Sequence, residues 1–276
     1  GAAARAAPRG PELAPLLAAA AIPAEERPAA EALARKVLRI AALNATCDGE
    51  FVALYTWFCR MNHSCVPNVS VVIDPNGDAS WVAGSHIAPG DEFYNEFLDP
   101  GGPLPFQDPL LLPTAMRRER LRRWGFECEC SRCSAPYDPE RAFACKACGH
   151  GCNLPDRSSG CEGLTACSSC AARPSPAAAA TRLQLEARHT KVALTDLGPR
   201  VIKEGKLTQG LRSSAQKLRA KCEDSALALS SDHWLVRWLA LVAGDGHMST
   251  ELPDWMPAPL RDFYGVCRTA NAHKKK

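Results

Sequence analysis

Residues 62–68 read Asn-His-Ser-Cys-Val-Pro-Asn, and residues 126–133 read Phe-Glu-Cys-Glu-Cys-Ser-Arg-Cys. The second stretch places three thiols within six residues, at Cys128, Cys130 and Cys133. A structural zinc site needs four ligands, so this cluster lacks one. The isolated Cys65 of the first stretch is the candidate fourth ligand. A lone cysteine is more commonly a small buried hydrophobe, but beside an incomplete thiol cluster we favour the metal.

A second candidate site follows closely in the chain. Two C-x-x-C pairs, separated by eighteen residues, have the spacing of a zinc ribbon. Cys152 and Cys161 lie between these pairs, and each is an alternative to one of the pair members or a free thiol. Four thiolates leave no open position for substrate or water, so both sites are predicted to be structural. The ligands expected for the second site are Cys145, Cys148, Cys167 and Cys170.

Composition narrows the class of protein. Nine of the fourteen cysteines fall between Cys128 and Cys170, a stretch with little apolar content. A secreted disulfide framework is the alternative, but C-x-x-C spacing favours zinc, and reduced thiols indicate an intracellular compartment. A net charge of +3 over 276 residues does not indicate nucleic-acid binding. No apolar run reaches the length of a membrane span.

The remaining sequence predicts a hairpin followed by helices. Apolar positions three and four apart predict helices over 31–45 and 207–222. Residues 69–93 predict a β-hairpin, because β-branched runs flank the turn Asp-Pro-Asn-Gly-Asp. The other expected features are a short strand over 93–98, a Pro-rich loop over 98–113, a basic helical turn over 117–126, a linker over 172–180, a capped helix over 231–244 with a Ser/Asp start and a Gly stop, a last helix over 258–269 and a solvated Lys-rich tail.

In this order the elements resemble the SET-domain protein methyltransferases, in particular the SET-and-MYND (SMYD-like) branch. That branch has N-H-S-C-x-P-N, then V-x-A-x-x-x-I-x-x-G-E-E-x-x-x-x-Y-x-D, then R-x-x-x-L and a cysteine-rich post-SET segment. The stretches WVAGSHIAPGDEFYNEFLD (81–99) and RRERLRRWGFECECSRC (117–133) follow this order closely. The resemblance covers roughly residues 40–135, with a looser likeness in the zinc ribbon and the C-terminal helices.

The resemblance implies a function for the N-H-S-C segment. In the family this segment passes through a neighbouring loop, as a pseudoknot, against the S-adenosylmethionine pocket. Asn62 and His63 are then expected to contact the cofactor, and Trp124 and Phe126 to pack against its adenine. Zinc bound by Cys65 and the post-SET thiols is expected to fasten that segment over the cofactor. Taken alone, the Asn-His pair reads as a turn and the two aromatic residues as core.

Two departures from the family pattern bear on activity. The family's tyrosine falls at Phe97, which keeps the ring and loses the hydroxyl; Tyr94 is three residues earlier, on the opposite face of a regular strand. No Gly-x-Gly turn precedes Asn62, so the chain lacks the pattern of the front of a SET domain. The first residue is Gly, which together with this absence suggests a fragment or a processed product.

We therefore expect an α+β fold with a mainly antiparallel SET-type β core containing the pseudoknot, a zinc-bound cysteine module and a helical C-terminal domain. The expected function is transfer of a methyl group from S-adenosylmethionine to a protein lysine, histone or non-histone, in the cytoplasm or nucleus. Phe97 and Tyr94 would line the lysine channel. The alternative is a zinc-stabilised scaffold without catalysis; a third, weaker interpretation is an interaction module. Expected regions are a low-complexity lead-in (1–30), the C-terminal part of the SET domain (31–127), the zinc modules (128–171) and the helical domain (181–276).

Overall fold

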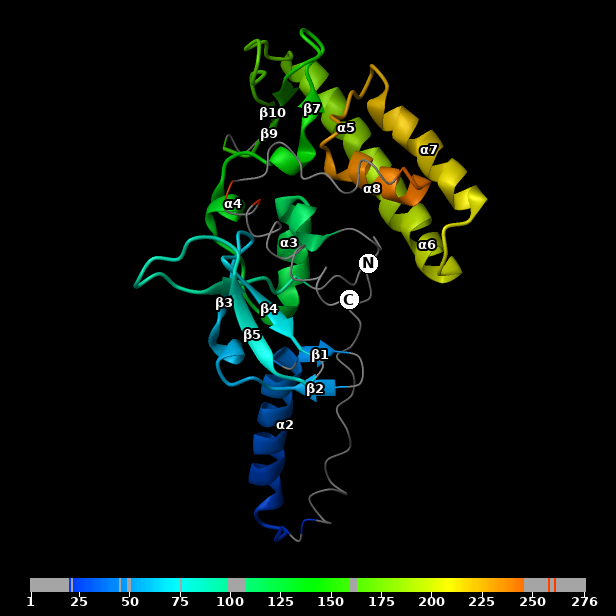
Figure 1. Cartoon of the computed structure of the whole chain (residues 1–276). Helices are drawn as coiled ribbons and strands as arrows, with labels where there is room; N and C mark the ends of the chain where they lie inside the picture. Colours follow the sequence, from blue (N-terminus) through cyan, green and yellow to red (C-terminus); the bar gives the residue numbers. More distant parts are fainter. Residues whose placement is uncertain are drawn as a thin grey trace. The chain divides into compact units, whose positions relative to one another are not determined.

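The computed structural model has a mixed helix and strand fold and describes residues 20, 22–44, 46–48, 51–74, 76–98, 108–158, 163–245, 258 and 261 (Figure 1). These residues group into two compact units. The first unit holds the described residues up to 61 together with 72–80, and the second holds residues 62–71 and those from 81 onward. None of the described helices is long and apolar enough to cross a membrane.

The first unit begins with helix α2 (Arg27–Asn44), which confirms the helix predicted over 31–45 and extends it by one turn. Its predicted apolar positions Leu33, Val37 and Ile40 are exposed in the structure. Strands β1 (Thr46–Asp48) and β2 (Phe51–Ala53) then form an antiparallel pair, followed by the 3₁₀ turn η1 (Phe58–Arg60).

The hairpin predicted over 69–93 is confirmed as strands β4 (Val69–Ile73) and β5 (Ala79–Ala83). Its turn forms because the Asp74 carboxylate accepts hydrogen bonds from the backbone N–H groups of Asn76 and Asp78, at 2.8 and 2.9 Å. Gly77 has a φ of 87° there, a conformation that residues with a Cβ rarely adopt.

The N-H-S-C segment begins with strand β3 (Asn62–His63), which pairs in parallel with β6 (Tyr94–Asn95). The strand predicted over 93–98 is therefore only two residues long. The described strands form separate pairs and not one sheet, so the predicted antiparallel core and its pseudoknot stay predictions. The parallel pair brings residues thirty-two positions apart side by side, which places His63 next to the segment containing Phe97.

The cysteine-rich segment is made of short elements. The Pro-rich loop predicted over 98–113 lies mostly outside the described residues, but its end forms the turn η2 (Pro109–Leu111), capped by Asp108. The predicted basic turn is helix α3 (Thr114–Leu121), which continues as η3 (Arg122–Trp124) and stops at Gly125 with a φ of 81°. After it come α4 (Ser131–Ser134), η4 (Pro139–Arg141), β7 (Phe143–Ala144), β8 (Cys152–Asn153), β9 (Pro155–Asp156) and β10 (Gly163–Leu164).

The linker predicted over 172–180 is wrong in its second half, where helix α5 (Pro176–Val192) begins. Ser175 caps it by accepting a hydrogen bond from Ala178 N–H at 3.3 Å, and Pro176 occupies the first turn, where its missing N–H is harmless. A π-helical turn η5 (Ala193–Leu197) and α6 (Gly198–Glu204) continue the helix to Gly205. The helix predicted over 258–269 lies outside the described residues apart from 258 and 261.

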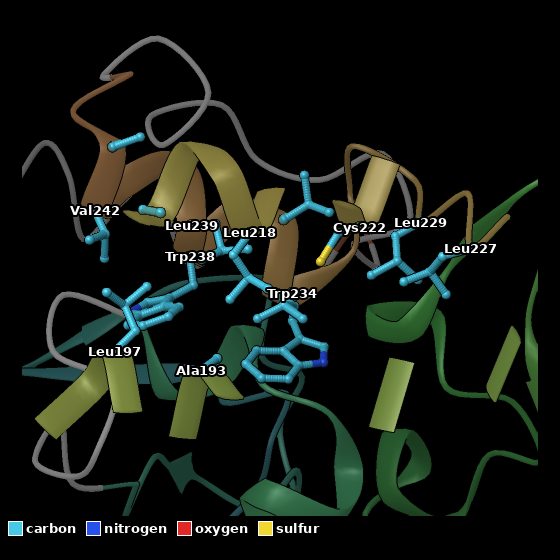
Figure 2. Close-up of a cluster of buried hydrophobic side chains, with 14 of the residues drawn as sticks. Ala193, Leu197, Leu218, Cys222, Leu227, Leu229, Trp234, Trp238, Leu239 and Val242 are labelled. Atoms are coloured by element: carbon cyan, nitrogen blue, oxygen red, sulfur yellow. The ribbon is translucent and has the colours of Figure 1, made fainter. Parts of the chain in front are cut away.

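Helices α7 (Gln209–Glu223) and α8 (Trp234–Ala243) pack against each other and confirm the helices predicted over 207–222 and 231–244. On α7 the predicted face is buried from Leu211 to Cys222. The cap of α8 is His233 and not the expected Ser or Asp, because its Nδ1 accepts from Leu235 N–H. Figure 2 shows the core that these helices enclose around Trp234 and Trp238. Phe143 and Leu164, from β7 and β10, belong to the same core, so the helices support the cysteine-rich segment.

Candidate functional site

Four thiols from two distant parts of the chain meet in the first candidate metal centre. The Sγ atoms of Cys65, Cys128, Cys130 and Cys133 all lie within 4.8 Å of one another. Cys65 Sγ is 3.5 Å from Cys133 Sγ and 4.0 Å from Cys128 Sγ, far beyond the roughly 2.05 Å of a disulfide. A tetrahedron with Zn–S bonds of about 2.3 Å has sulfur–sulfur edges of about 3.8 Å. The group therefore fits a four-thiolate zinc ion.

The local backbone structure positions each of these cysteines. Cys65 follows strand β3, Cys128 and Cys130 lie on the extended stretch after Gly125, and Cys133 lies in the single turn α4. Cys65 is fully buried, and Leu98, Leu110 and Leu121 pack around the thiols. A lone buried cysteine with only apolar neighbours would be inert, but here it faces three further thiols. The structure thus brings together the four residues that the sequence selects for this site.

The second candidate metal centre joins the two C-x-x-C pairs. Cys145, Cys148, Cys167 and Cys170 also have their Sγ atoms within 4.8 Å of one another. In each pair a backbone N–H two residues on donates to the first sulfur at 3.4 Å, from Ala147 to Cys145 and from Ser169 to Cys167. Each pair then turns through a left-handed residue, with φ of 72° at Gly149 and 59° at Ala171. Both knuckles have the same geometry, as expected for a zinc ribbon.

Cys152 stays outside this group. Its thiol lies 3.9 Å from the Ser168 hydroxyl, and burial raises its pKa. The four sulfurs that the structure gathers are those of the C-x-x-C pairs. Cys161, the other alternative ligand, lies outside the described residues.

An aromatic group adjoins the first thiol cluster. The Phe97 ring lies 5.1 Å from Trp124, 5.6 Å from His63 and 6.5 Å from Phe126, measured between ring centroids. Trp124 Nε1 donates to the Phe97 carbonyl at 3.1 Å, which fixes the indole against the segment that follows β6. Phe126 is 37% exposed, so one ring of the group faces solvent. Three of the residues predicted to bind cofactor therefore gather around Phe97, one of the two predicted to line the lysine channel.

His63 links the aromatic group to the thiols. Its Nδ1 accepts a hydrogen bond from Phe97 N–H at 3.0 Å, so the ring proton must sit on Nε2. Nε2 lies 3.3 Å from Cys65 Sγ and donates toward that sulfur. Burial lowers the pKa of His63 to about 4, so the imidazole is neutral at pH 7. Hydrogen bonds of this kind orient metal ligands.

Asn62 and Tyr94 lie on a second, exposed surface. The Asn62 amide and the Tyr94 hydroxyl both donate to the carboxylate of Glu92, the latter at 2.8 Å. These hydrogen bonds lower the pKa of Glu92. Asn68 holds the loop in place by donating to the Glu92 carbonyl at 2.8 Å and accepting from Tyr94 N–H at 2.7 Å. The Tyr94 hydroxyl thus binds Glu92 and is not part of the ring group around Phe97.

Sequence reasoning missed Glu92 and Asn68 as organisers of this surface, although both lie within the motifs that it quoted. It also missed a buried charged group of Arg117, Arg132 and Glu140 beside the first thiol cluster. Charged residues in a polar, cysteine-rich stretch give no periodic signal, so nothing in the local pattern separates these from exposed ones.

Two four-thiol centres in an α+β fold define the class: a protein with two candidate structural zinc sites. Comparison with known proteins narrows it. No family model matches the chain. The chain is 37% identical over 84 residues to the N-lysine methyltransferase SMYD2-B of Danio rerio, and 36% identical over 84 residues to N-lysine methyltransferase SMYD2 of Homo sapiens. Each match covers 30% of this chain and 17% of the relative. The likeness to N-lysine methyltransferases is therefore partial.

Proposed function

We propose that this chain is part of a SET-type protein-lysine N-methyltransferase of the SMYD-like branch. It would transfer a methyl group from S-adenosylmethionine to the side chain of a lysine in a protein substrate. The observation that carries the proposal is the first thiol cluster, in which the N-H-S-C segment contributes the fourth sulfur to three thiols about sixty residues downstream. The partial likeness to N-lysine methyltransferases supports the same assignment.

We propose a role for each region of the chain. Residues 31–127 would be the C-terminal portion of the SET domain, 128–171 the two zinc modules and 181–276 the helical domain, after a lead-in over 1–30. Zinc at both four-thiol centres would be structural, because four thiolates fill its coordination. The first centre would hold the aromatic group and the N-H-S-C segment together, so that the cofactor surface forms only when the metal is bound.

The residues around the aromatic group fit S-adenosylmethionine. The exposed ring of Phe126 and the indole of Trp124, which both contact Phe97, offer apolar surface to an adenine. On the second surface, Asn62, next in sequence to His63, binds Glu92 through Nδ2, and its Oδ1 would be the acceptor for an ammonium group. When bound, the cofactor supplies an electrophilic methyl group. His63, held neutral by burial, would position the segment without adding a like charge to the sulfonium.

The chain's own contribution to the reaction would be positioning and desolvation. A lysine must lose its proton to attack, against an ordinary pKa of about 10.4. A narrow apolar channel favours the neutral amine, and aligning the reacting atoms removes much of the entropic barrier. Phe97 and Tyr94 are proposed to line that channel, although the Tyr94 hydroxyl is bound to Glu92.

A second candidate function has an observation in its favour. Phe97 supplies no hydroxyl, and its ring is packed among His63, Trp124 and Phe126. A zinc-stabilised scaffold that has lost catalysis would show this arrangement. Turnover by the wild-type chain separates the two candidates, because a scaffold that lost catalysis with the hydroxyl transfers no methyl group unless Phe97 is replaced by Tyr.

Calorimetric titration of the zinc-loaded chain with S-adenosylmethionine tests the proposal. We expect binding that the Phe126→Ala and Asn62→Ala variants each weaken by about tenfold. The control is Phe93→Ala, another exposed aromatic residue, which packs on Trp81 and is outside the proposed site. Binding that none of the variants changes, or no binding by the zinc-loaded chain, would contradict the assigned cofactor site. Methyl transfer to lysine peptides by the wild type, compared with Phe97→Tyr, then decides between enzyme and scaffold: turnover by the wild type identifies an enzyme, and turnover by Phe97→Tyr alone identifies a scaffold.

A further inference from the structure

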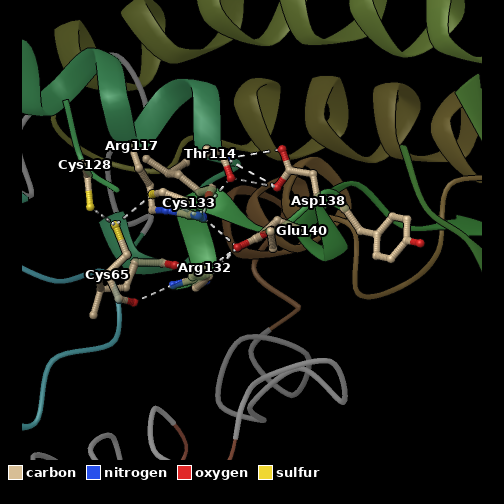
Figure 3. Close-up of polar contacts among 12 residues, drawn as sticks. Cys65, Thr114, Arg117, Cys128, Arg132, Cys133, Asp138 and Glu140 are labelled. Atoms are coloured by element: carbon tan, nitrogen blue, oxygen red, sulfur yellow. Dashed lines mark hydrogen bonds and ion pairs between the residues drawn. The ribbon is translucent and has the colours of Figure 1, made fainter. Parts of the chain in front are cut away.

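A buried charged group lies directly behind the first thiol cluster (Figure 3). Arg117 and Arg132 both bind the same oxygen, Oε1 of Glu140, and the first of these contacts measures 2.6 Å. The side chains of Arg117 and Glu140 are completely buried, and that of Arg132 is 4% exposed. Removing three charged groups from water is costly. This charged group makes interactions that apolar side chains could not make.

The two arginines reach both halves of the metal centre. Arg132 donates to the carbonyl of Cys65 at 2.9 Å, and so binds the N-H-S-C segment. Arg117 donates to the Thr114 hydroxyl at 3.0 Å and to the carbonyl of Leu112, and its NH2 group lies 3.8 Å from Cys133 Sγ. The Arg117 guanidinium therefore donates a hydrogen bond to one sulfur of the first thiol cluster.

The contact between Arg117 and Cys133 places positive charge beside a group that would be negatively charged when zinc is bound. Four thiolates around one Zn²⁺ carry a net charge of 4 × (−1) + 2 = −2, and the sulfurs of Cys65 and Cys133 are buried. The two arginines and Glu140 together carry 2 − 1 = +1, placed against that charge. Burial and the neighbouring Glu140 raise the pKa of Asp138, which lies beside Thr114, and so favour its neutral form.

We propose that Arg117 is an outer-sphere partner of the first metal centre, which holds the Cys133 thiolate and offsets the negative charge of the zinc–thiolate group, with Glu140 and Arg132 fixing its guanidinium. This inference rests on the proposed zinc site. Partners of this type orient ligands and typically change metal affinity by about 10- to 100-fold. Near the second centre, Arg182 instead donates to the backbone carbonyls of Ala144, Leu227 and Ala228.

The test measures the rate at which zinc leaves the chain for a chromogenic chelator. The wild type should release two equivalents. Arg117→Met should release one equivalent about 10- to 100-fold faster and leave the other unchanged, which makes the second centre an internal reference. Arg117→Lys keeps the charge but not the forked geometry, and we expect an intermediate rate. The control is Arg122→Met, an arginine that is 77% exposed and paired with Glu119, which should match the wild type.

The accelerated equivalent is assigned with a second variant. Cys65→Ser should hold one equivalent, and adding Arg117→Met to it should leave the release of that equivalent unaltered. Equal acceleration of both equivalents would indicate general destabilisation and overturn the inference, as would wild-type rates in both Arg117 variants. A wild-type chain that binds no zinc would instead remove the proposed metal site itself. Far-UV circular dichroism verifies that each variant retains its helices.

Discussion

At the scale of single residues, His63 shows how one side chain joins two parts of the candidate site. The backbone N–H of Phe97 fixes its tautomer, and the opposite nitrogen then points to Cys65. The sequence predicts His63 as a cofactor contact and Cys65 as a zinc ligand, but not this hydrogen bond between them. The bond depends on the pairing of β3 with β6, which no local pattern encodes.

Gly151 is a second residue whose role depends on three-dimensional packing. A Cβ atom at this position would lie 2.5 Å from Cys167 Sγ and 2.6 Å from the Ser169 hydroxyl. We therefore expect Gly151→Ala to displace Cys167 and weaken zinc binding at the second centre by about tenfold or more. Competition with a chelator measures this change.

The matched control for that variant is Gly163→Ala, where an added Cβ meets no described atom within 4 Å. It should bind two equivalents of zinc as tightly as the wild type. If Gly151→Ala also matched the wild type, the packing proposed for the second centre would be wrong.

At the scale of elements, one carboxylate ties three of them together. Glu186 on α5 binds Arg141 at the end of η4 at 2.6 Å, and accepts from His233 Nε2, at the start of α8, at 3.0 Å. The protonation of His233 follows from its cap, because Nδ1 accepts from Leu235 N–H. Hydrogen bonds and the charges of its partners lower the pKa of Glu186 to about 2, in spite of its burial.

Glu186→Gln should lower the free energy of unfolding by about 3 kcal/mol at pH 7, because it removes the negative charge that the largely buried Arg141 binds. The folded-state pKa of Glu186 lies below its ordinary value of 4.5. The stabilisation is therefore present above pH 4.5 and is lost as the pH falls toward 2. Denaturant unfolding, followed by circular dichroism, should show the gap between variant and wild type narrowing over that range.

The control for this prediction is Glu223→Gln, which breaks a more exposed pair with Arg219 on α7 and should cost less than about 1 kcal/mol. A constant difference between Glu186→Gln and the wild type from pH 7 to pH 3 would show that the ionised carboxylate is not the source of the stability.

The sequence predicts long elements better than short ones. The apolar face of α7, from Leu211 to Cys222, repeats often enough to be read directly. The start of α5 was mistaken for a linker because proline and alanine look like low complexity, although Ser175 and Pro176 form a proper helix start. Strand β6 has only two residues, too few for any periodicity to bound it.

At the scale of the whole molecule, the eight candidate metal ligands selected from the sequence are those that the fold brings into two groups. Spacing sufficed because C-x-x-C pairs determine their own local geometry. Cys65 could be selected only because three neighbouring thiols needed a fourth ligand. The group of Arg117, Arg132 and Glu140 could not be predicted, because it depends on packing among segments that are far apart in sequence.

The proposed function requires that a single metal ion joins the N-H-S-C segment to the cysteine-rich segment. Zinc content per chain, measured by inductively coupled plasma mass spectrometry on the wild type and on Cys65→Ser, tests it most directly. Cys222→Ser is the control, since Cys222 is equally buried but lies in the helical core. We predict two equivalents for the wild type and the control, and one for Cys65→Ser. Two equivalents in Cys65→Ser would contradict the shared site and, with it, the proposed function.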